Sequence, residues 1–454
     1  MGLLSLIKNF RAPVLPLATK EYNEQATNQM ANILRLYFNQ LDQLLGKIVA
    51  TITPSGSEDD PLYVGTYDSR GRLQVTNPQT IFFNTFQYGL ETDVWETNTA
   101  SGGTATFEAN TSSVQMAVTS SINSECIRQT LHVQRYIPGR PSSIAFAVRL
   151  QTPVVGIRRR FGLFDGNNGF FFEDDGGTYA CVIVSDASGV TVYNRVTRTN
   201  WNGDKLDGTG TSGITADPVA IQLIDVEYEW YGAGQVVFRY IINGNPITIH
   251  TFSSANLQSI PWCKTPFLPI RMEIKNTTGA TGTHYLWQGS NSLTSYGSTA
   301  KLGIGQNILT PTAGIALTAA NTFYPIVSIR LKSSALQGVV LPTFFQAATL
   351  DNTNIFFKII RNATLNGTWV DMPDANSFTQ YNYTSTGAVT TGTDLFSGYI
   401  PANSGGLINE LDSDTVFQIG RSSLGTVSDT LTLAIAATGA NKSGVGSLTW
   451  IEQR

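Results

Sequence analysis

The sequence predicts a mainly β protein with an N-terminal extended arm and one coiled-coil-like helix, followed by two β-sandwich domains of the jelly-roll, lectin-like kind. Charged residues make up only 14% of the 454 residues and 42 are glycine, a profile typical of turn-rich β proteins. Between Ile224 and Trp230, apolar side chains alternate with acidic ones. This alternation indicates a strand with one face on a core and the other in water.

The first 18 residues are predicted to form a docking arm. Pro13 and Pro16 prevent a continuous helix here and favour an extended path. Leu6, Phe10 and Leu15 belong to a strongly apolar set, and apolar surface of this kind is a liability when exposed. We therefore expect these three side chains to anchor the chain in a larger assembly. A disordered terminus is the alternative.

One helix is predicted over residues 19–49, with Thr19 as its N-cap and Gly46 weakening its last turn. Its apolar residues recur at alternating steps of four and three, the spacing of a coiled-coil seam. The seam consists of Met30, Leu34, Tyr37, Leu41, Leu44 and Ile48. No other segment is predicted to be a helix of comparable length, so we expect a homo-oligomer, a trimer, built on this seam. Packing across the chain's own sheet is the alternative.

Residues 50–290 are predicted to form the first β-sandwich. Asn243-Gly244 separates two strand-like runs and is a strong signal for a two-residue hairpin. The predicted strands are Pro61–Tyr67, Ile81–Tyr88, Ser113–Val118, Ser124–Tyr136, Ser143–Leu150, Ile157–Phe164, Gly169–Glu173, Tyr179–Ser185, Val190–Thr197, Ile221–Tyr231, Gln235–Ile242, Pro246–Thr251, Ile270–Lys275 and His284–Trp287.

Residues 291–322 are rich in Ser, Thr, Gly and Ala and are predicted to be a linker that contains at most one strand. Residues 323–454 are predicted to form a second, smaller sandwich of about eight strands, the size of a small jelly roll. Its strands are predicted at Pro325–Leu331, Gly338–Phe345, Asn354–Arg361, Thr368–Pro373, Asp394–Ile400, Thr415–Gly420, Thr430–Ala436 and Gly446–Glu452.

Composition excludes several classes of function. The net charge is −4 and the pI is near 5.5, so there is no basic excess for binding nucleic acid. Cys126, Cys181 and Cys263 are too few and too scattered for a disulfide framework or a zinc site, and we interpret them as reduced core residues. No hydrophobic run approaches the length of a membrane span, and Leu3–Ile7 is too short for the apolar core of a signal peptide.

No catalytic motif stands out. The sequence has no Gly-x-Ser-x-Gly elbow and no phosphate-binding loop, so it predicts no enzyme, no catalytic residue and no cofactor. His132, His250 and His284 stand alone within predicted strands, and we expect structural roles for them. Glu227 and Glu229 share one face of a strand, as paired acids of a glycosidase would, but the alternation places that face in water.

The only candidate metal ligands are Asp165, Asn167 and Glu173, whose oxygen atoms suit calcium. Their spacing does not match an EF-hand loop, and a hairpin turn explains the same residues because Asn and Gly tolerate positive φ. The sequence therefore predicts no metal site. Trp201 and Tyr193 are candidates for stacking on a sugar, with ordinary core filling as the alternative.

Six short stretches, in four blocks, carry a resemblance to a known group of proteins: Tyr22–Glu24 with Ile33–Asp42, Arg160–Glu173, Val226–Arg239, and Ser328–Lys332 with Thr368–Asp371. They resemble virion structural proteins of tailed phages that infect cyanobacteria or other marine bacteria. The block Val226–Arg239 is also similar to lectin-like jelly rolls. The resemblance implies a tail-fibre, baseplate-associated or head-decoration role. Because the sequence has no triple-β-spiral or β-helix repeats, it favours a compact adaptor or short fibre over a long shaft.

We therefore expect a structural protein of the phage virion, a short tail fibre or baseplate/tail adaptor that is made in the cytoplasm of the host bacterium. Its partners would be copies of itself and other virion proteins of the tail, baseplate or head, and several copies would add avidity. One alternative is a carbohydrate-binding host-recognition module, whose partner would be a host surface glycan. Others are a capsid or neck decoration protein and a polysaccharide depolymerase.

The double substitution Leu34→Asp and Leu41→Asp is expected to convert the oligomer into monomers, because it places charges in the apolar seam. Light scattering after size exclusion measures the mass directly. Gln29→Asp with Gln43→Asp, off the seam, is the matched control and should leave the oligomer intact. An oligomer that survives the seam substitutions would show that the seam is wrongly assigned.

Overall fold

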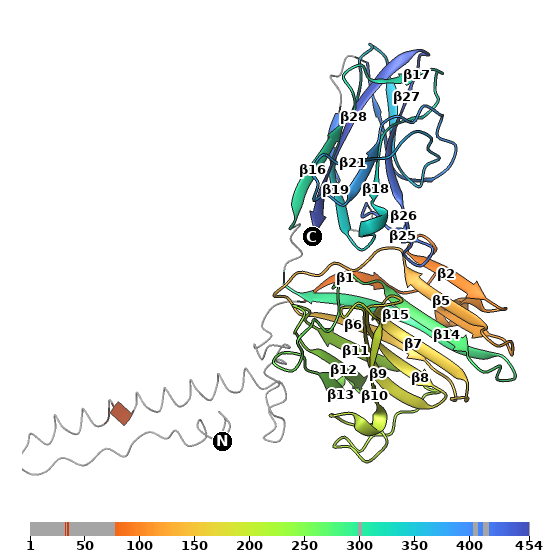
Figure 1. The fold of residues 1–454 in the computed structure, drawn as a ribbon, viewed down its shortest axis with the longest axis vertical. Coiled ribbons are helices and arrows are strands. Elements are labelled where there is room, and N and C mark those ends of the chain that lie inside the picture. The colour runs from red at the N-terminus through yellow and green to blue at the C-terminus, as the bar shows by residue number, and fades with distance from the viewer. Residues whose placement is uncertain are drawn as a thin grey trace, which may run out of the picture. The chain divides into compact units, whose positions relative to one another are not determined.

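The structure is a computed structural model that describes Asn32, Leu34, Arg35 and residues 78–297, 302–402, 407–411 and 417–453. From Pro78 onward these residues belong to one compact unit (Figure 1). The predicted docking arm, the predicted strand Pro61–Tyr67 and nearly all of the predicted helix lie outside the described residues. Asn32, Leu34 and Arg35 are helical, but the described residues contain no coiled coil.

The first sandwich, within residues 78–297, consists of an eight-stranded and a seven-stranded antiparallel sheet (Figure 1). The larger sheet contains β1 (Pro78–Asn84), β3 (Thr104–Glu108), β4 (Ser113–Val118), β6 (Ser142–Arg149), β11 (Gln222–Tyr228), β12 (Val236–Ile242), β13 (Asn245–Phe252) and β15 (His284–Tyr296). Its order is β13-β12-β11-β6-β15-β4-β3, and β1 pairs with β15.

The smaller sheet contains β2 (Trp95–Ala100), β5 (Glu125–Thr130), β7 (Ile157–Phe164), β8 (Gly169–Asp175), β9 (Thr178–Ser185), β10 (Val192–Thr197) and β14 (Ile270–Asn276). Its order is β10-β9-β8-β7-β14-β5-β2. Because neighbours such as β7 and β14 are far apart in sequence, the sheet order cannot be read from the order of the strands along the chain.

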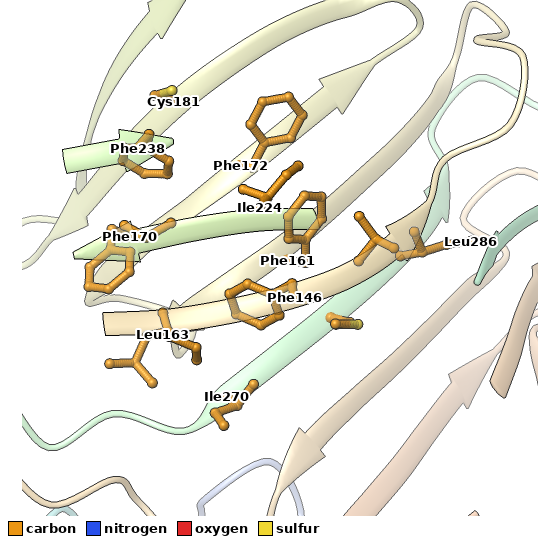
Figure 2. Packing of buried hydrophobic residues seen from close by; sticks show 14 of the residues in the cluster. Phe146, Phe161, Leu163, Phe170, Phe172, Cys181, Ile224, Phe238, Ile270 and Leu286 are labelled. Carbon is orange, nitrogen blue, oxygen red and sulfur yellow. The ribbon is translucent and has the colours of Figure 1, made fainter. Parts of the chain in front are cut away.

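Aromatic residues fill the space between these two sheets (Figure 2). The ring centroids of Phe146 on β6 and Phe161 on β7 are 5.5 Å apart in an edge-to-face arrangement, which joins one sheet to the other. Phe161 also stacks on Phe172 of β8 at 5.3 Å. Aromatic pairs of this geometry add about 0.5–1.5 kcal/mol to the gain from burial. Cys126, Cys181 and Cys263 are buried and free, as the sequence predicts.

The second sandwich follows the same plan on a smaller scale. One sheet contains β16 (Ile304–Leu309), β17 (Ile315–Leu317), β19 (Val339–Thr349), β24 (Leu407–Glu410) and β28 (Lys442–Gln453). The other contains β18 (Tyr324–Leu331), β20 (Ile355–Arg361), β21 (Val370–Asp371), β22 (Thr379–Asn382), β23 (Thr393–Ile400) and β27 (Thr430–Ala437). A short hairpin of β25 (Arg421–Ser422) and β26 (Val427–Ser428) stands apart.

The segment 291–322, predicted to be a linker, differs from that prediction. It contains the end of β15 and the strands β16 and β17, which both pair with β28. Small and polar residues dominate this stretch, so its composition resembles that of a loop although its backbone completes a sheet. No helix in the described part of the chain is long and apolar enough to cross a bilayer.

Hydrogen bonds and a small apolar cluster join the two sandwiches. Arg421 donates its backbone N–H to the carbonyl of Leu131 at 2.8 Å, and the side chain of Gln418 donates to the carbonyl of Val133 at 2.9 Å. Val133 also packs on Val339 in the second sandwich. Between these two carbonyls lies His132, so its imidazole belongs to the junction between the sandwiches.

Burial, reinforced by the guanidinium groups of Arg361 and Arg421, lowers the pKa of His132 to about 4 from an ordinary value near 6.5. A base whose pKa is lowered by folding contributes stability that is complete above the unfolded pKa and is lost as the pH falls toward the folded value. The free energy of unfolding is therefore expected to fall by about 3 kcal/mol between pH 6.5 and pH 4 through this residue.

Urea unfolding of the wild type and of His132→Gln at pH 7, 5.5 and 4.5 tests this expectation. The variant should lose most of the pH dependence that the wild type shows over this interval, while His284→Gln should retain it. If His132→Gln kept the full pH dependence, the stability loss would have to come from other groups.

Candidate functional site

The candidate site lies on the outer face of the eight-stranded sheet, around the acidic residues of β11. Ile224, Val226 and Tyr228 point into the core between the sheets, so Asp225 and Glu227, which alternate with them, point outward. The sequence predicts a solvated acidic face here, and that prediction is wrong. Glu227 is 1% exposed and Glu229 0%, because β11 is an inner strand and side chains of its neighbours cover it.

Arg239 on β12 neutralises this acidic row. Its Nη1 lies 2.8 Å from Glu227 Oε2 and 3.3 Å from Asp225 Oδ2. The hydroxyl of Ser143 on β6 donates a hydrogen bond to the other oxygen of Asp225. Burial raises the pKa of Asp225, although Ser143 and Arg239 both act to lower it. Burial alone would lower the pKa of Arg239, but Glu227 and Asp225 outweigh it and raise that pKa.

Small side chains form the floor of this face, and an aromatic ring stands at its edge. The register across the sheet places Arg239, Asp225, Ala145, Ser292 and Phe83 opposite one another in one row. Ala145 and Ser292 are only half-buried, so solvent reaches the floor between the acid and the ring. Phe83 is 70% exposed, far more than an aromatic side chain in a well-packed sandwich needs to be.

A second aromatic group lies farther along β15 on the same face. Tyr285 and Trp287 have ring centroids 5.4 Å apart, and the guanidinium of Arg149 lies 3.6 Å from the centroid of Trp287. All three side chains are half-buried. Arg149 lies directly opposite Trp287 in the register. The guanidinium of Arg149 therefore holds the indole ring of Trp287 in place beside Ala145 and Ser292.

We define the outer-face site as Phe83, Trp287, Asp225 and Arg239 with the small floor of Ala145 and Ser292 between them, and Glu227 as the buried partner that holds Arg239. Carboxylate and guanidinium groups bind hydroxyls through strong, charge-assisted hydrogen bonds. Aromatic rings present flat apolar area at low cost in side-chain entropy. The arrangement therefore suits an extended ligand that carries many hydroxyls and has one apolar face.

The other sequence-predicted site residues fall in different places. Of the predicted oligomerisation and docking residues only Leu34 is described, and it is 38% exposed. Those outside the described residues are Leu6, Phe10, Leu15, Met30, Tyr37, Leu41, Leu44 and Ile48. Trp201 is buried and donates from Nε1 to the carbonyl of Val196, whereas Tyr193 is exposed.

The structure does not bring the candidate calcium ligands together. Asp165 Oδ1 accepts the backbone N–H groups of Asn167 and Asn168, both at 2.8 Å, which is the hairpin turn expected for this sequence. Glu173 lies toward the far end of β8 and pairs with Arg160 and Arg195 at 2.7 and 2.5 Å. Within the described residues no group of three acidic, histidine or cysteine side chains is placed to hold a metal ion.

Comparison with known proteins gives no family model that matches and no curated protein that matches. Solved structures do resemble part of the chain. A legume lectin-like domain from Entamoeba histolytica is 12% identical with a TM-score of 0.28, covering 46% of this chain and 95% of its own. A putative β-glucanase from Mycobacterium abscessus is 9% identical with a TM-score of 0.34, covering 47% of this chain and 100% of its own.

A mixed-linkage glucan GH16 protein from Bacteroides ovatus is also 9% identical, with a TM-score of 0.32, covering 47% of this chain and 99% of its own. The names of the glucanase and the GH16 protein contradict the sequence-based prediction that the chain is not an enzyme, and that prediction is withdrawn. At TM-scores near 0.3, these likenesses assign no activity to this chain.

Arg239→Met is expected to destabilise the protein by about 3–5 kcal/mol, because Glu227 then stays buried without its guanidinium partner. Urea unfolding at pH 7 measures the change. Lys358→Met is the matched control, since it breaks a short but exposed ion pair with Asp394 and should cost no more than about 1 kcal/mol. Equal costs for the two variants would contradict a charged, buried carboxylate row.

Proposed function

We propose that the outer-face site binds a carbohydrate. The observation that carries this proposal is the combination, on one face, of exposed or half-buried aromatic rings with the partly exposed Asp225–Arg239 ion pair across a floor of small residues. Each part suits one property of a sugar: the rings suit its C–H face, and the charged pairs suit its hydroxyls.

The geometry also supports discrimination among ligands. Arg239 contacts both Asp225 and Glu227, so the hydrogen-bonding groups are held in place before any ligand arrives. A preorganised site loses less entropy on binding than one that must order its side chains. A buried polar group that a wrong ligand leaves unpaired costs about 1–3 kcal/mol, so the position of each hydroxyl matters.

The virion role stays a separate proposal, which rests on the apolar arm and the seam in the sequence of residues 1–49. The two proposals are compatible. A trimer that docks in a phage particle through the arm would present three copies of the outer-face site. Binding through several copies raises the effective affinity for a multivalent surface glycan by orders of magnitude.

A glycan array probed with the full chain tests the proposal, followed by titration calorimetry of the best ligand. Trp287→Ala and Phe83→Ala are each expected to weaken binding about tenfold, or 1.4 kcal/mol, through lost stacking. Tyr193→Ala removes an exposed aromatic ring from the other sheet and should leave the affinity unchanged.

Failure of the full chain to bind any glycan would refute the proposal. If both Trp287→Ala and Phe83→Ala kept full affinity, the glycan would not bind at the outer-face site.

A further inference from the structure

A cavity of about 680 Å³ lies between the two sandwiches. From the first sandwich it is lined by β1 around Phe83, by Asp93 and by the segment around His132. From the second it is lined by Arg361 at the end of β20 and by Leu395 on β23. Cavities of this size at domain interfaces are a usual place for small ligands to bind.

The cavity has an apolar side and a polar side. Ile81, Phe82 and Phe83 on β1 contribute apolar surface, together with Leu395 of the second sandwich. The register between β1 and β15 shifts between Thr80 and Phe82, so Ile81 sits at a bulge in an edge strand. Bulges of this kind turn a side chain away from its usual direction, and here the bulged residue lines the cavity.

The charged groups of the lining balance one another. Arg361 Nη2 lies 3.0 Å from Asp93 Oδ1, and its Nη1 donates to the carbonyl of the same residue at 3.1 Å. Asp394 pairs with Lys358 at 2.5 Å. The lining holds two arginines, Arg135 and Arg361, and two aspartates, so its formal charge is zero with His132 neutral. A strongly charged ligand would therefore find no net attraction there.

The ion pair between Arg361 and Asp93 supplies hydrogen-bonding groups to this lining. The side chain of Asp93 is 80% exposed, so its carboxylate can accept a hydrogen bond from a ligand hydroxyl while Arg361 holds it in place. Hydrogen bonds in which one partner is charged are roughly twice as strong as those between neutral groups.

We infer that this cavity binds a neutral, hydroxyl-rich ring, a monosaccharide unit, with the Asp93 carboxylate accepting a hydrogen bond from a hydroxyl and the β1 residues packing on its C–H face. The inference extends the proposed function, because Phe83 belongs both to the outer-face site and to the cavity lining. A glycan on the outer face then continues past Phe83, and the cavity holds its terminal unit. The second sandwich thereby completes a binding site that begins on the first.

Saturation-transfer NMR on the full chain tests this inference with glucose, galactose, mannose and N-acetylglucosamine as neutral probes, and glucuronate and sialic acid as anionic probes. At least one neutral monosaccharide should bind, and the anionic probes should not. Thr393→Trp, at an exposed cavity-lining position of the edge strand β23, should fill the cavity and weaken that binding more than tenfold. Ser397→Trp, exposed on the same strand and not part of that lining, is the matched control.

Asp93→Ala removes the exposed carboxylate from the lining and should weaken binding in the same direction. Thr393→Trp keeps the test decisive if Asp93→Ala does not fold. The inference is overturned if no neutral monosaccharide binds, if Thr393→Trp binds as tightly as Ser397→Trp, or if the anionic probes bind better than the neutral ones.

Variants of the outer face separate this inference from the proposed function. Trp287→Ala should weaken binding of a long glycan and leave monosaccharide binding unchanged. If Trp287→Ala and Phe83→Ala do not affect the long glycan while Thr393→Trp abolishes monosaccharide binding, the outer-face proposal fails and the cavity stands. If Thr393→Trp affects neither ligand while Trp287→Ala weakens the long glycan, the cavity inference fails and the outer-face proposal stands.

Discussion

The contact between aromatic side chains of the two sheets is the constraint on which the first sandwich depends. Phe146 meets Phe161 across the interior, and Phe161 continues to Phe172. Since side chains alternate along a strand, fixing these rings inside also fixes which residues face outward. Asp225 and Glu227 lie on the outer face because Ile224 and Val226 are needed in the core. A slip of one residue in β11 would place carboxylates between the sheets and leave apolar residues in the site.

Much of the fold follows from the local pattern, because alternation and turn chemistry are local properties. The hairpin at Asn243-Gly244 joins β12 to β13 as the sequence predicts, and the turn that begins at Asp165 joins β7 to β8. Prediction fails where the strand signal is weak. β2 has Thr and Asn in place of apolar residues, and β16 and β17 lie in a segment whose composition resembles that of a linker. These strands form because neighbouring strands offer hydrogen-bond partners.

The site could be predicted only in part. The acids of β11 stand out in the sequence, but their burial does not, since it depends on Arg239 and Ser143 arriving from β12 and β6. The row from Asp225 to Phe83 crosses strands that are distant along the chain. No periodicity within one strand reveals such a row. A tryptophan and a run of alternating acids are visible separately, whereas their common face is a property of the sheet order.

The position of β1 gives this architecture a mechanical consequence. β1 is the first strand of the described compact unit, and it is held to the rest of its sheet through β15. Any tension applied at the N-terminal side of the chain therefore enters the sandwich through the hydrogen bonds between β1 and β15. Phe83 lies on β1. A force applied before Pro78 would therefore act on Phe83 before it reached the core of the sandwich.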